Sequence, residues 1–560
     1  MASSAMHCRL LLLTLLVALA ILAAPARAAG TATTAVAITA AVERATPPSA
    51  PATVPAGRGS ARSRADVRAF YAARNHAPAW HDDNGATPAA IAVLRALRTA
   101  DNKGLDARHY DGTALTYRLL DLPLRGPPDD RWADWDVALS LALARYLQDL
   151  HFGRIDPAAV GHGLRVDPAR IDLAAVLAGI ATGVDVDAKI AAVEPAFRHY
   201  RLLEQQLVRY RELAAIPGLT SLPPLPKRTV EPGEDYAGAV ALARLLAALG
   251  DLPDADAVTD GRFDTNLSTA VQRFQRRHGL EADGRLGRGT FVALTTPLRR
   301  RVQQIELTLE RWRWLPPRLE SPPIIVNIPA FRLYAFTTTD DDESHMLRMN
   351  VIVGQAFREQ HTPVFAANMT HLIFDPYWDV PRSIALKELL PDIRRHPGYM
   401  EKNHFELVAG QSDDSPVLAP TAANLALVAA GRARLRQRPR DDNALGRVKF
   451  MLPNSYNVYL HDTPAKSLFA RARRAFSHGC VRLGDPVGLA EHVLRGSPEW
   501  THERILEAMK GDAPERVYLP APVRVFFVYG TALASDTQVF FFEDVYGHDE
   551  TLARALRASR

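Results

Sequence analysis

The stretch NVYLHDTPAKSLFARARRAFSHGCVRL, residues 457–483, joins a strand pattern to a single cysteine. Apolar side chains alternate there with Tyr459 and His461, so a strand would place these two polar side chains on one face. Cys480 follows His461 by nineteen residues. The stretch therefore predicts a strand whose end carries His461 and faces a loop that carries Cys480.

A cysteine and a histidine in this arrangement are typical of nucleophilic catalysis. A thiol of ordinary pKa is mostly protonated at neutral pH, so a cysteine nucleophile needs a nearby base. His461 is the candidate base, and Asp462 could orient it through its side chain or its backbone carbonyl. Gly479 allows a close backbone approach, and the amides of Gly479 and Cys480 could point at a developing oxyanion. Two alternatives stay open, an inert buried Cys480 and zinc ligation by His461, His478 and Cys480, although compact ligand spacing is absent.

The other cysteine, Cys8, lies in an N-terminal segment typical of a secretory signal peptide. A weakly basic head precedes a 15-residue apolar run, and the pattern ARA at residues 26–28 predicts cleavage after Ala28. Cleavage would leave Cys480 as the sole cysteine of an exported protein, which excludes an intramolecular disulfide. The apolar run is shorter than the roughly 20 residues of a spanning helix. An uncleaved membrane anchor is the alternative.

The composition is that of folded globular protein, with 47% hydrophobic and 23% charged residues. A length of 560 residues suits several domains of about 100–200 residues each. The net charge of +5 falls to +3 without residues 1–28, because that segment carries Arg9, Arg27 and no acid. This mild charge argues against a nucleic-acid partner, for which a clustered basic face is expected. We expect no cofactor.

The spacing of apolar residues changes along the chain. Apolar residues at three- and four-residue spacing predict helices from 65 to 230, and short β-branched and aromatic runs predict a mostly β region from 320 to 545. Between them, Asp264 can cap a helix whose apolar stripe ends at Phe274. The order GRFDTNLSTAVQRFQRRHGLEADGRLGRGTFVAL, residues 261–294, resembles the three-helix peptidoglycan-binding domain.

The stretch from His461 to Arg482 resembles the catalytic signature of the L,D-transpeptidase family. That signature is a histidine and, after a spacer, Ser/Thr-His-Gly-Cys followed by a hydrophobic and a polar residue. The last position is Asn in many members and Arg here, which is similar to the large multi-domain Gram-negative subgroup and leaves the substrate contact of this position open. Two further stretches of sequence also resemble that subgroup: FDPYWDVPRSIA, residues 374–385, and VKFMLPNSYNVYLHDTP, residues 448–464.

The resemblance implies a multi-domain α+β protein. Its mostly β catalytic domain would carry a helical capping insertion and be joined to an all-α scaffold and a three-helix peptidoglycan-binding domain. The expected divisions are a signal peptide (1–28), a flexible Ala/Pro/Ser/Thr linker (29–64), a helical scaffold (65–230) completed by 297–318, the peptidoglycan-binding domain (235–296), the catalytic domain (320–545) with its capping insertion (384–446), and a C-terminal tail (546–560).

The resemblance also implies a function. It predicts a periplasmic cysteine acyltransferase that forms 3–3 cross-links in peptidoglycan and is a carbapenem target. Cys480 would take the acyl group of a stem tetrapeptide and pass it to a diaminopimelate amine. The partners would be peptidoglycan stem peptides and glycan, with other cell-wall synthases besides. Three alternatives are an L,D-carboxypeptidase that uses the same thioester, a non-catalytic peptidoglycan-binding protein and a zinc peptidase.

Substrate contacts are expected from five residues, each with a plainer alternative. Ser477 belongs to the signature, and His478 would shape the loop and oxyanion hole rather than act as the base. Tyr459 shares the face of His461 but could simply pack there. Arg482 could hold a stem carboxylate, for which a guanidinium is suited, or form a surface ion pair. Trp378 could line the cleft, although a tryptophan in a β domain more often belongs to the core.

Overall fold

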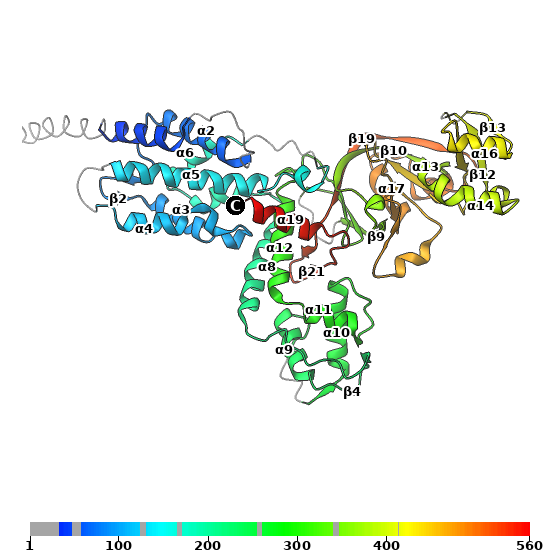
Figure 1. The fold of residues 1–560 in the computed structure, drawn as a ribbon, viewed down its shortest axis with the longest axis horizontal. Coiled ribbons are helices and arrows are strands. Elements are labelled where there is room, and N and C mark those ends of the chain that lie inside the picture. Colours follow the sequence, from blue (N-terminus) through cyan, green and yellow to red (C-terminus); the bar gives the residue numbers. More distant parts are fainter. Residues whose placement is uncertain are drawn as a thin grey trace, which may run out of the picture.

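The computed structural model describes residues 33–47, 58–123, 130–164, 171–254, 260–339, 346–410, 412 and 414–559. The predicted signal peptide, residues 1–28, lies outside the described residues. Figure 1 shows a helical region at one end, a β-rich region toward the other and a helical arm between them. The predicted multi-domain mixture of helices and strands is confirmed.

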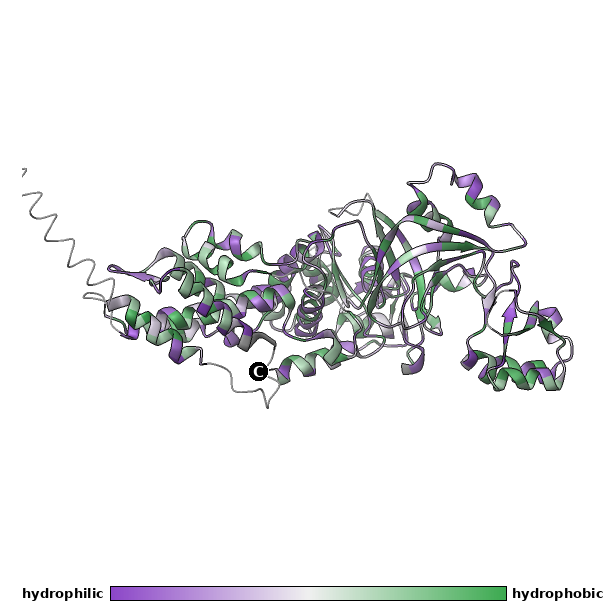
Figure 2. Cartoon of the chain, turned by 90° about the horizontal axis from the view of Figure 1, so that it is seen from above, coloured by the Kyte–Doolittle hydropathy of each residue, from purple (hydrophilic) through white to green (hydrophobic). Residues whose placement is uncertain are grey.

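The N-terminal region is a helical bundle with its own hydrophobic core. Its elements are α2 (Arg58–Ala73), β1 (His81–Asp82), β2 (Gly85–Ala86), α3 (Pro88–Arg98), η1 (Ala100–Lys103), η2 (Ala107–Tyr110), α4 (Gly112–Leu120), α5 (Asp130–Phe152), α6 (Leu173–Ala181) and α7 (Val186–Ala191). Between α5 and α6 lies η3 (Pro157–Val160), which packs outside this core, against the core that contains the β region. Helix α5 buries Trp135, Leu139, Leu143 and Leu147 completely, because a four-residue spacing keeps them on one face. Figure 2 shows both hydrophobic and hydrophilic residues along the bundle helices, as expected for helices buried on one side.

The prediction that residues 29–64 form a flexible linker is wrong for part of this segment. Residues 33–45 form a helix, and α2 already begins at Arg58. Ile38, Ala41 and Val42 are buried in the core of the bundle. The segment is rich in alanine, which favours helix, and these three residues fall on one helical face. The first described residues are thus part of the scaffold fold.

Two long helices connect the bundle to the rest of the molecule. Helix α8 (Arg198–Ala215) packs against α12 (Leu298–Trp312). Both contribute to a second hydrophobic core that they share with the β region, whereas α2–α7 belong to the first. The predicted helical unit 65–230 therefore divides between two cores. Buried Arg313, at the end of α12, donates to the Tyr200 hydroxyl at 2.9 Å and to the Lys103 carbonyl, which ties this pair of helices to the bundle.

The helical arm lies between α8 and α12 in the chain. Its elements are β3 (Thr229–Val230), β4 (Glu234–Asp235), α9 (Ala239–Leu249), β5 (Arg262–Phe263), α10 (Thr265–Arg277), β6 (Leu286–Gly287) and α11 (Arg288–Leu294). The predicted cap of α10 is confirmed, since the Asp264 carboxylate accepts from the Leu267 N–H at 2.8 Å. The stripe that ends at Phe274 is buried.

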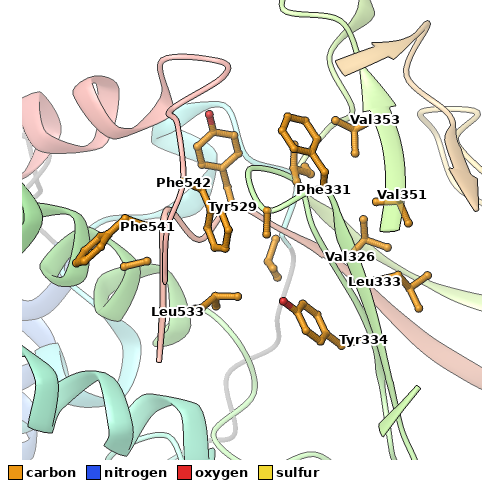
Figure 3. Packing of buried hydrophobic residues seen from close by; sticks show 14 of the residues in the cluster. Val326, Phe331, Leu333, Tyr334, Val351, Val353, Tyr529, Leu533, Phe541 and Phe542 are labelled. Atoms are coloured by element: carbon orange, nitrogen blue, oxygen red, sulfur yellow. The ribbon is translucent and has the colours of Figure 1, made fainter. Parts of the chain in front are cut away.

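The β region is built on a sheet of nine strands in the described part of the chain, in the order β17-β9-β18-β16-β15-β10-β19-β7-β8. The strands are β7 (Ile324–Asn327), β8 (Arg332–Phe336), β9 (Met346–Gly354), β10 (Phe365–Phe374), β15 (Val448–Met451), β16 (Leu460–His461), β17 (Ala475–Ser477), β18 (Val481–Leu483) and β19 (Glu515–Val528). Strand β8 also pairs with β9, so the sheet curves and closes on itself. Helices α17 (Pro486–Leu494) and α18 (His502–Ala508) and the hairpin β20 (Ala532–Ala534) and β21 (Val539–Phe541) flank it. Figure 3 shows side chains of β7–β9 facing those of the segment 529–542.

The insertion after β10 is not the purely helical unit that we predicted. It contains the sheet β11-β14-β12-β13 and a small hydrophobic core of its own. Its elements are β11 (Trp378–Asp379), α13 (Arg382–Ile384), the π-helical turn η5 (Ala385–Leu389), α14 (Leu390–Arg395), α15 (Tyr399–Lys402), β12 (Phe405–Ala409), β13 (Val417–Leu418), α16 (Ala422–Ala429) and β14 (Ala433–Gln437). The sequence does not indicate strand β14, because charged residues occupy its buried positions. Arg434 and Arg436 are buried there in ion pairs with Asp379 and Glu406.

The C-terminal tail forms a docked helix, α19 (His548–Ala558). Leu552 is fully buried, and Asp549 forms an ion pair of 2.6 Å with Arg311 on α12. The end of the chain is thus fastened to the helices that connect the bundle and the sheet (Figure 1). Among the described helices, none combines the length and apolar character needed to span a membrane.

Candidate active site

The pairing of two short strands brings the predicted site residues together. Strands β16 and β18 are parallel, with Leu460 opposite Val481 and His461 opposite Arg482. Leu460 and Val481 are fully buried on the core side. Because side chains alternate along a strand and paired residues share a face, His461 and Arg482 lie on the other face. Cys480, directly before Val481, belongs to that same face.

Tyr459 completes this face. Its backbone carbonyl accepts from the Val481 N–H at 3.1 Å, which places it opposite Cys480. Its ring centroid lies 5.7 Å from that of His461. Burial, together with the nearby Cys480 thiol, raises the pKa of Tyr459 well above its usual value. Tyr459 therefore stays protonated and can donate to the sulfur.

The Cys480 thiol is free and half-buried. It donates to the Asn457 carbonyl at an S···O distance of 3.6 Å. Burial raises the pKa of Cys480, although Tyr459 and the positive charges of Lys449 and Arg482 act against the rise. The resting cysteine is consequently a neutral thiol with groups already in place to stabilise a thiolate.

The structure selects the atom that orients His461. Nδ1 lies 2.6 Å from the backbone carbonyl of Asp462. The Asp462 carboxylate is used elsewhere, accepting from the Arg447 N–H at 2.9 Å and pairing with Lys466. An Nδ1–H that donates to a carbonyl leaves Nε2 as the nitrogen able to accept a proton. Burial, reinforced by the charge of Arg482, lowers the pKa of His461 to about 3, so the ring is neutral.

The loop before Cys480 is held by Ser477. The Ser477 hydroxyl donates to the Cys480 carbonyl at 2.5 Å and accepts from the Gly479 N–H at 3.1 Å. Ser477 is buried, so its hydroxyl braces the loop and does not face a substrate. The predicted use of the Gly479 amide in an oxyanion hole conflicts with this bond. Among the described residues nothing accepts from the Cys480 N–H, which leaves that amide as the candidate donor. Gly479 has φ of +122°, a conformation that favours glycine.

The other two predicted contacts, His478 and Trp378, involve the insertion. Exposed His478 places Nε2 2.9 Å from the carboxylate of Glu388 in η5, so it bridges the loop to the insertion and does not join Cys480 and His461 in a metal-binding set. Trp378 lies in β11 and packs on the insertion's core, with its ring 6.1 Å from that of Phe405. The structure thus places Trp378 in packing and not on the face that carries Cys480.

Two cations give this face its charge. Arg482 is half-buried, and in the described part of the chain its Nε lies buried without a hydrogen-bond partner. The surface ion pair considered for Arg482 is not formed among the described residues. Lys449 of β15 is opposite His461, and its Nζ lies 4.0 Å from the Tyr459 ring centroid. Our sequence reasoning missed Lys449, whose only signal is its place in a strand that pairs with β16.

Comparisons with known proteins match three parts of the chain. Residues 65–207 match the family described as "Scaffold domain", residues 237–294 the "Putative peptidoglycan binding domain" and residues 322–501 the "L,D-transpeptidase catalytic domain". A Haemophilus influenzae protein named "Putative L,D-transpeptidase" is 29% identical over 257 residues, which are 45% of this chain and 49% of that protein. The chain thus spans about half the length of this curated relative. By these matches, residues 322–501 belong to the L,D-transpeptidase catalytic domain family and residues 237–294 to the peptidoglycan-binding domain family.

Proposed function

We propose that this protein is an L,D-transpeptidase that forms 3–3 cross-links in peptidoglycan outside the cytoplasm. The observation that carries the proposal is the shared face of β16 and β18, on which a thiol, an oriented neutral imidazole and a guanidinium without a partner among the described residues lie together. The family matches of residues 322–501 and 237–294 support peptidoglycan as the substrate.

In the first half-reaction, Cys480 Sγ attacks the carbonyl carbon of the third residue of a stem tetrapeptide. The thiol proton passes to His461 Nε2, and negative charge develops on the substrate oxygen. The C–N bond to the terminal D-Ala then breaks, and the D-Ala amine leaves with the proton from His461. A thioester on Cys480 remains.

In the second half-reaction, the side-chain amine of a neighbouring diaminopimelate attacks the thioester. His461 takes a proton from this amine, an amide bond forms, and the proton returns to the departing sulfur. Arg482 would bind a stem carboxylate, since a half-buried guanidinium without an acid partner among the described residues suits an anionic ligand.

The charge states of the site suit this scheme. Because the pKa of Cys480 is raised and that of His461 is lowered, both groups are neutral before substrate binds. Proton transfer therefore accompanies the attack on the carbonyl. The hydroxyl of Tyr459 and the charges of Lys449 and Arg482 lower the free energy of the thiolate character that appears on the way.

We also propose that the insertion is a cap over the donor site. The contact between His478 and Glu388 joins it to the loop that carries Cys480. A cap in this place would exclude water, so the thioester would react with an amine in preference to hydrolysis.

Intact-mass analysis of the purified chain tests the proposal. The protein and its Cys480→Ala variant are incubated separately with a carbapenem and with disaccharide-tetrapeptide. We expect a covalent adduct and a cross-linked dimer with the native protein alone. Release of tripeptide without dimer would establish an L,D-carboxypeptidase instead. Folded native protein that gives neither adduct nor product would leave a non-catalytic peptidoglycan-binding protein.

A further inference from the structure

The loop that carries Cys480 is held from behind by a buried threonine. The Thr362 hydroxyl donates to the Gly479 carbonyl at 2.7 Å and accepts from the Gly354 N–H at 2.9 Å. Its side chain is fully buried. Thr362 therefore connects the end of β9 to the peptide directly before Cys480.

Thr362 is in turn held by a residue beyond the part of the chain that matches the catalytic family. The Tyr546 hydroxyl accepts from the Thr362 N–H at 3.3 Å and donates to the Gly354 carbonyl at 2.7 Å. The Tyr546 ring stacks on His361 with centroids 3.9 Å apart and planes 8° from parallel. The match ends at residue 501, so this support comes from the C-terminal segment.

Tyr546 is itself fixed in place. Its backbone N–H donates to the Tyr529 hydroxyl at 2.8 Å, and Tyr529 donates to the Asp544 carboxylate at 2.6 Å. The same carboxylate accepts from the first backbone amides of α19, including that of His548 at 2.9 Å. Burial raises the pKa of Tyr546 to about 12, so its hydroxyl keeps the proton that it donates.

Because of the geometry of the peptide bond, this support also fixes the direction in which the Cys480 N–H points. The Gly479 carbonyl and the Cys480 N–H belong to one planar trans peptide, so they point in opposite directions. Because the carbonyl points to Thr362, the Cys480 N–H points to the opposite side. The preceding peptide is fixed as well, since the Gly479 N–H donates to Ser477. Neither neighbouring peptide plane can turn without breaking a hydrogen bond.

We propose that Tyr546 and Thr362 are positioning residues for acyl transfer. They hold the Gly479–Cys480 peptide so that the Cys480 N–H meets the negative charge that develops on the substrate oxygen. The inference rests on the proposed role of Cys480 as the acyl-transfer nucleophile. It predicts that the two residues affect attack on a carbonyl and leave reactions of the thiol that form no oxyanion unaffected.

Two reactions of Cys480 in the full chain separate these cases. Acylation by a carbapenem forms an oxyanion, whereas alkylation by iodoacetamide does not. We expect Thr362→Val to slow acylation about 10- to 100-fold and Tyr546→Phe about 3- to 10-fold, since one oxyanion donor contributes about 10²–10³ in rate. Alkylation rates stay within about twofold of the native rate, because the thiol and its base are untouched. Thr362→Ser keeps the hydroxyl and restores acylation, and Tyr518→Phe, at a tyrosine that is 66% exposed, is the matched control.

The outcomes are distinguishable. Equal losses in acylation and alkylation would reduce the two residues to a structural role and overturn the proposal, as would unchanged acylation in both variants. If Thr362→Val lowers the melting temperature so far that the protein unfolds, Tyr546→Phe decides, because it keeps the stacked ring. A native protein that is alkylated but never acylated would refute the proposed function itself.

Discussion

Substitution of Gly163 tests how firmly the helical bundle is joined to the active site. The Gly163 N–H donates to the Val364 carbonyl at 2.8 Å, and Gly163 forms a parallel bridge with Phe365 of β10. A Cβ at position 163 would lie 1.9 Å from the Tyr456 hydroxyl oxygen. Tyr456 precedes Asn457, whose carbonyl accepts from the Cys480 thiol. Gly163→Ala therefore pushes on a loop that contacts the proposed nucleophile.

The size of the effect follows from these contacts. Relief of the clash requires a shift of about 1.5 Å, because non-bonded atoms separate to about 3.5 Å. Tyr456 is 45% exposed, so its ring can move into solvent and lose its packing on Phe365, 5.0 Å away. That aromatic pair contributes about 0.5–1.5 kcal/mol, and overpacking costs about 1–3 kcal/mol. We expect a local destabilisation of about 1–3 kcal/mol, which corresponds to roughly 5- to 150-fold faster amide exchange around Gly163.

Hydrogen exchange with a double-mutant cycle is the assay. Gly161→Ala is the control, because Gly161 has φ of +77° but no heavy atom within 4 Å of its added Cβ. It loses stability through its backbone alone and should leave carbapenem acylation unchanged, whereas Gly163→Ala slows acylation. In a Tyr456→Ala background the cost of Gly163→Ala should nearly vanish. An equal cost in both backgrounds would refute the reasoning, since the clash with Tyr456 would then not be its source.

Three further changes bear on the proposed chemistry. The rate of carbapenem acylation should not change between pH 5 and 8. The lowered pKa of His461 keeps the base neutral over this range, and the raised pKa of Cys480 keeps the thiol protonated. An inflection near pH 6.5 in a stopped-flow pH–rate profile would contradict this prediction. Arg482→Gln should raise KM for tetrapeptide donor about tenfold or more, since a charged hydrogen bond contributes about 1.5–3 kcal/mol, and steady-state kinetics that show an unchanged KM would exclude the carboxylate contact. Glu388→Gln weakens the exposed bond to His478, an effect of at most about 1 kcal/mol, and should raise the ratio of hydrolysis to cross-linking in muropeptide chromatography. The same ratio as in Glu401→Gln, an exposed position of the insertion, would count against the cap.

The centre of the site could be predicted because its geometry is local. The alternation in NVYLH is enough to put Tyr459 and His461 on one face, and Cys480 leads directly into the strand that pairs beside them. The helix capped by Asp264 is equally local, since cap and apolar stripe lie within a few turns. In both cases the residues that decide the structure are near neighbours in the chain, so periodicity contains the information.

Other features depend on partners that periodicity does not identify. Lys449 joins the face of His461 only through the pairing of β15 with β16. From the sequence, either the carboxylate or the backbone carbonyl of Asp462 could orient His461. In the structure the carbonyl does so, because the carboxylate is bound by the backbone N–H of Arg447 and by Lys466. Strand β14 was not predicted because its buried positions are occupied by charged residues, arginines that form ion pairs with acids of neighbouring strands.

The surroundings of Cys480 draw on regions that a catalytic domain ending at residue 501 would lack. Strand β19 lies between β10 and β7 in the sheet, so without it β7 and β8 would stay attached through β9 alone. Tyr546 follows β19 and holds Thr362, and Gly163, far upstream, limits the position of Tyr456. The helical bundle and the C-terminal helix are also joined directly, since His162 Nε2 lies 3.1 Å from His548 Nδ1. Segments from before and after the matched residues 322–501 therefore contact the surroundings of Cys480, and the geometry of the site depends on how they dock.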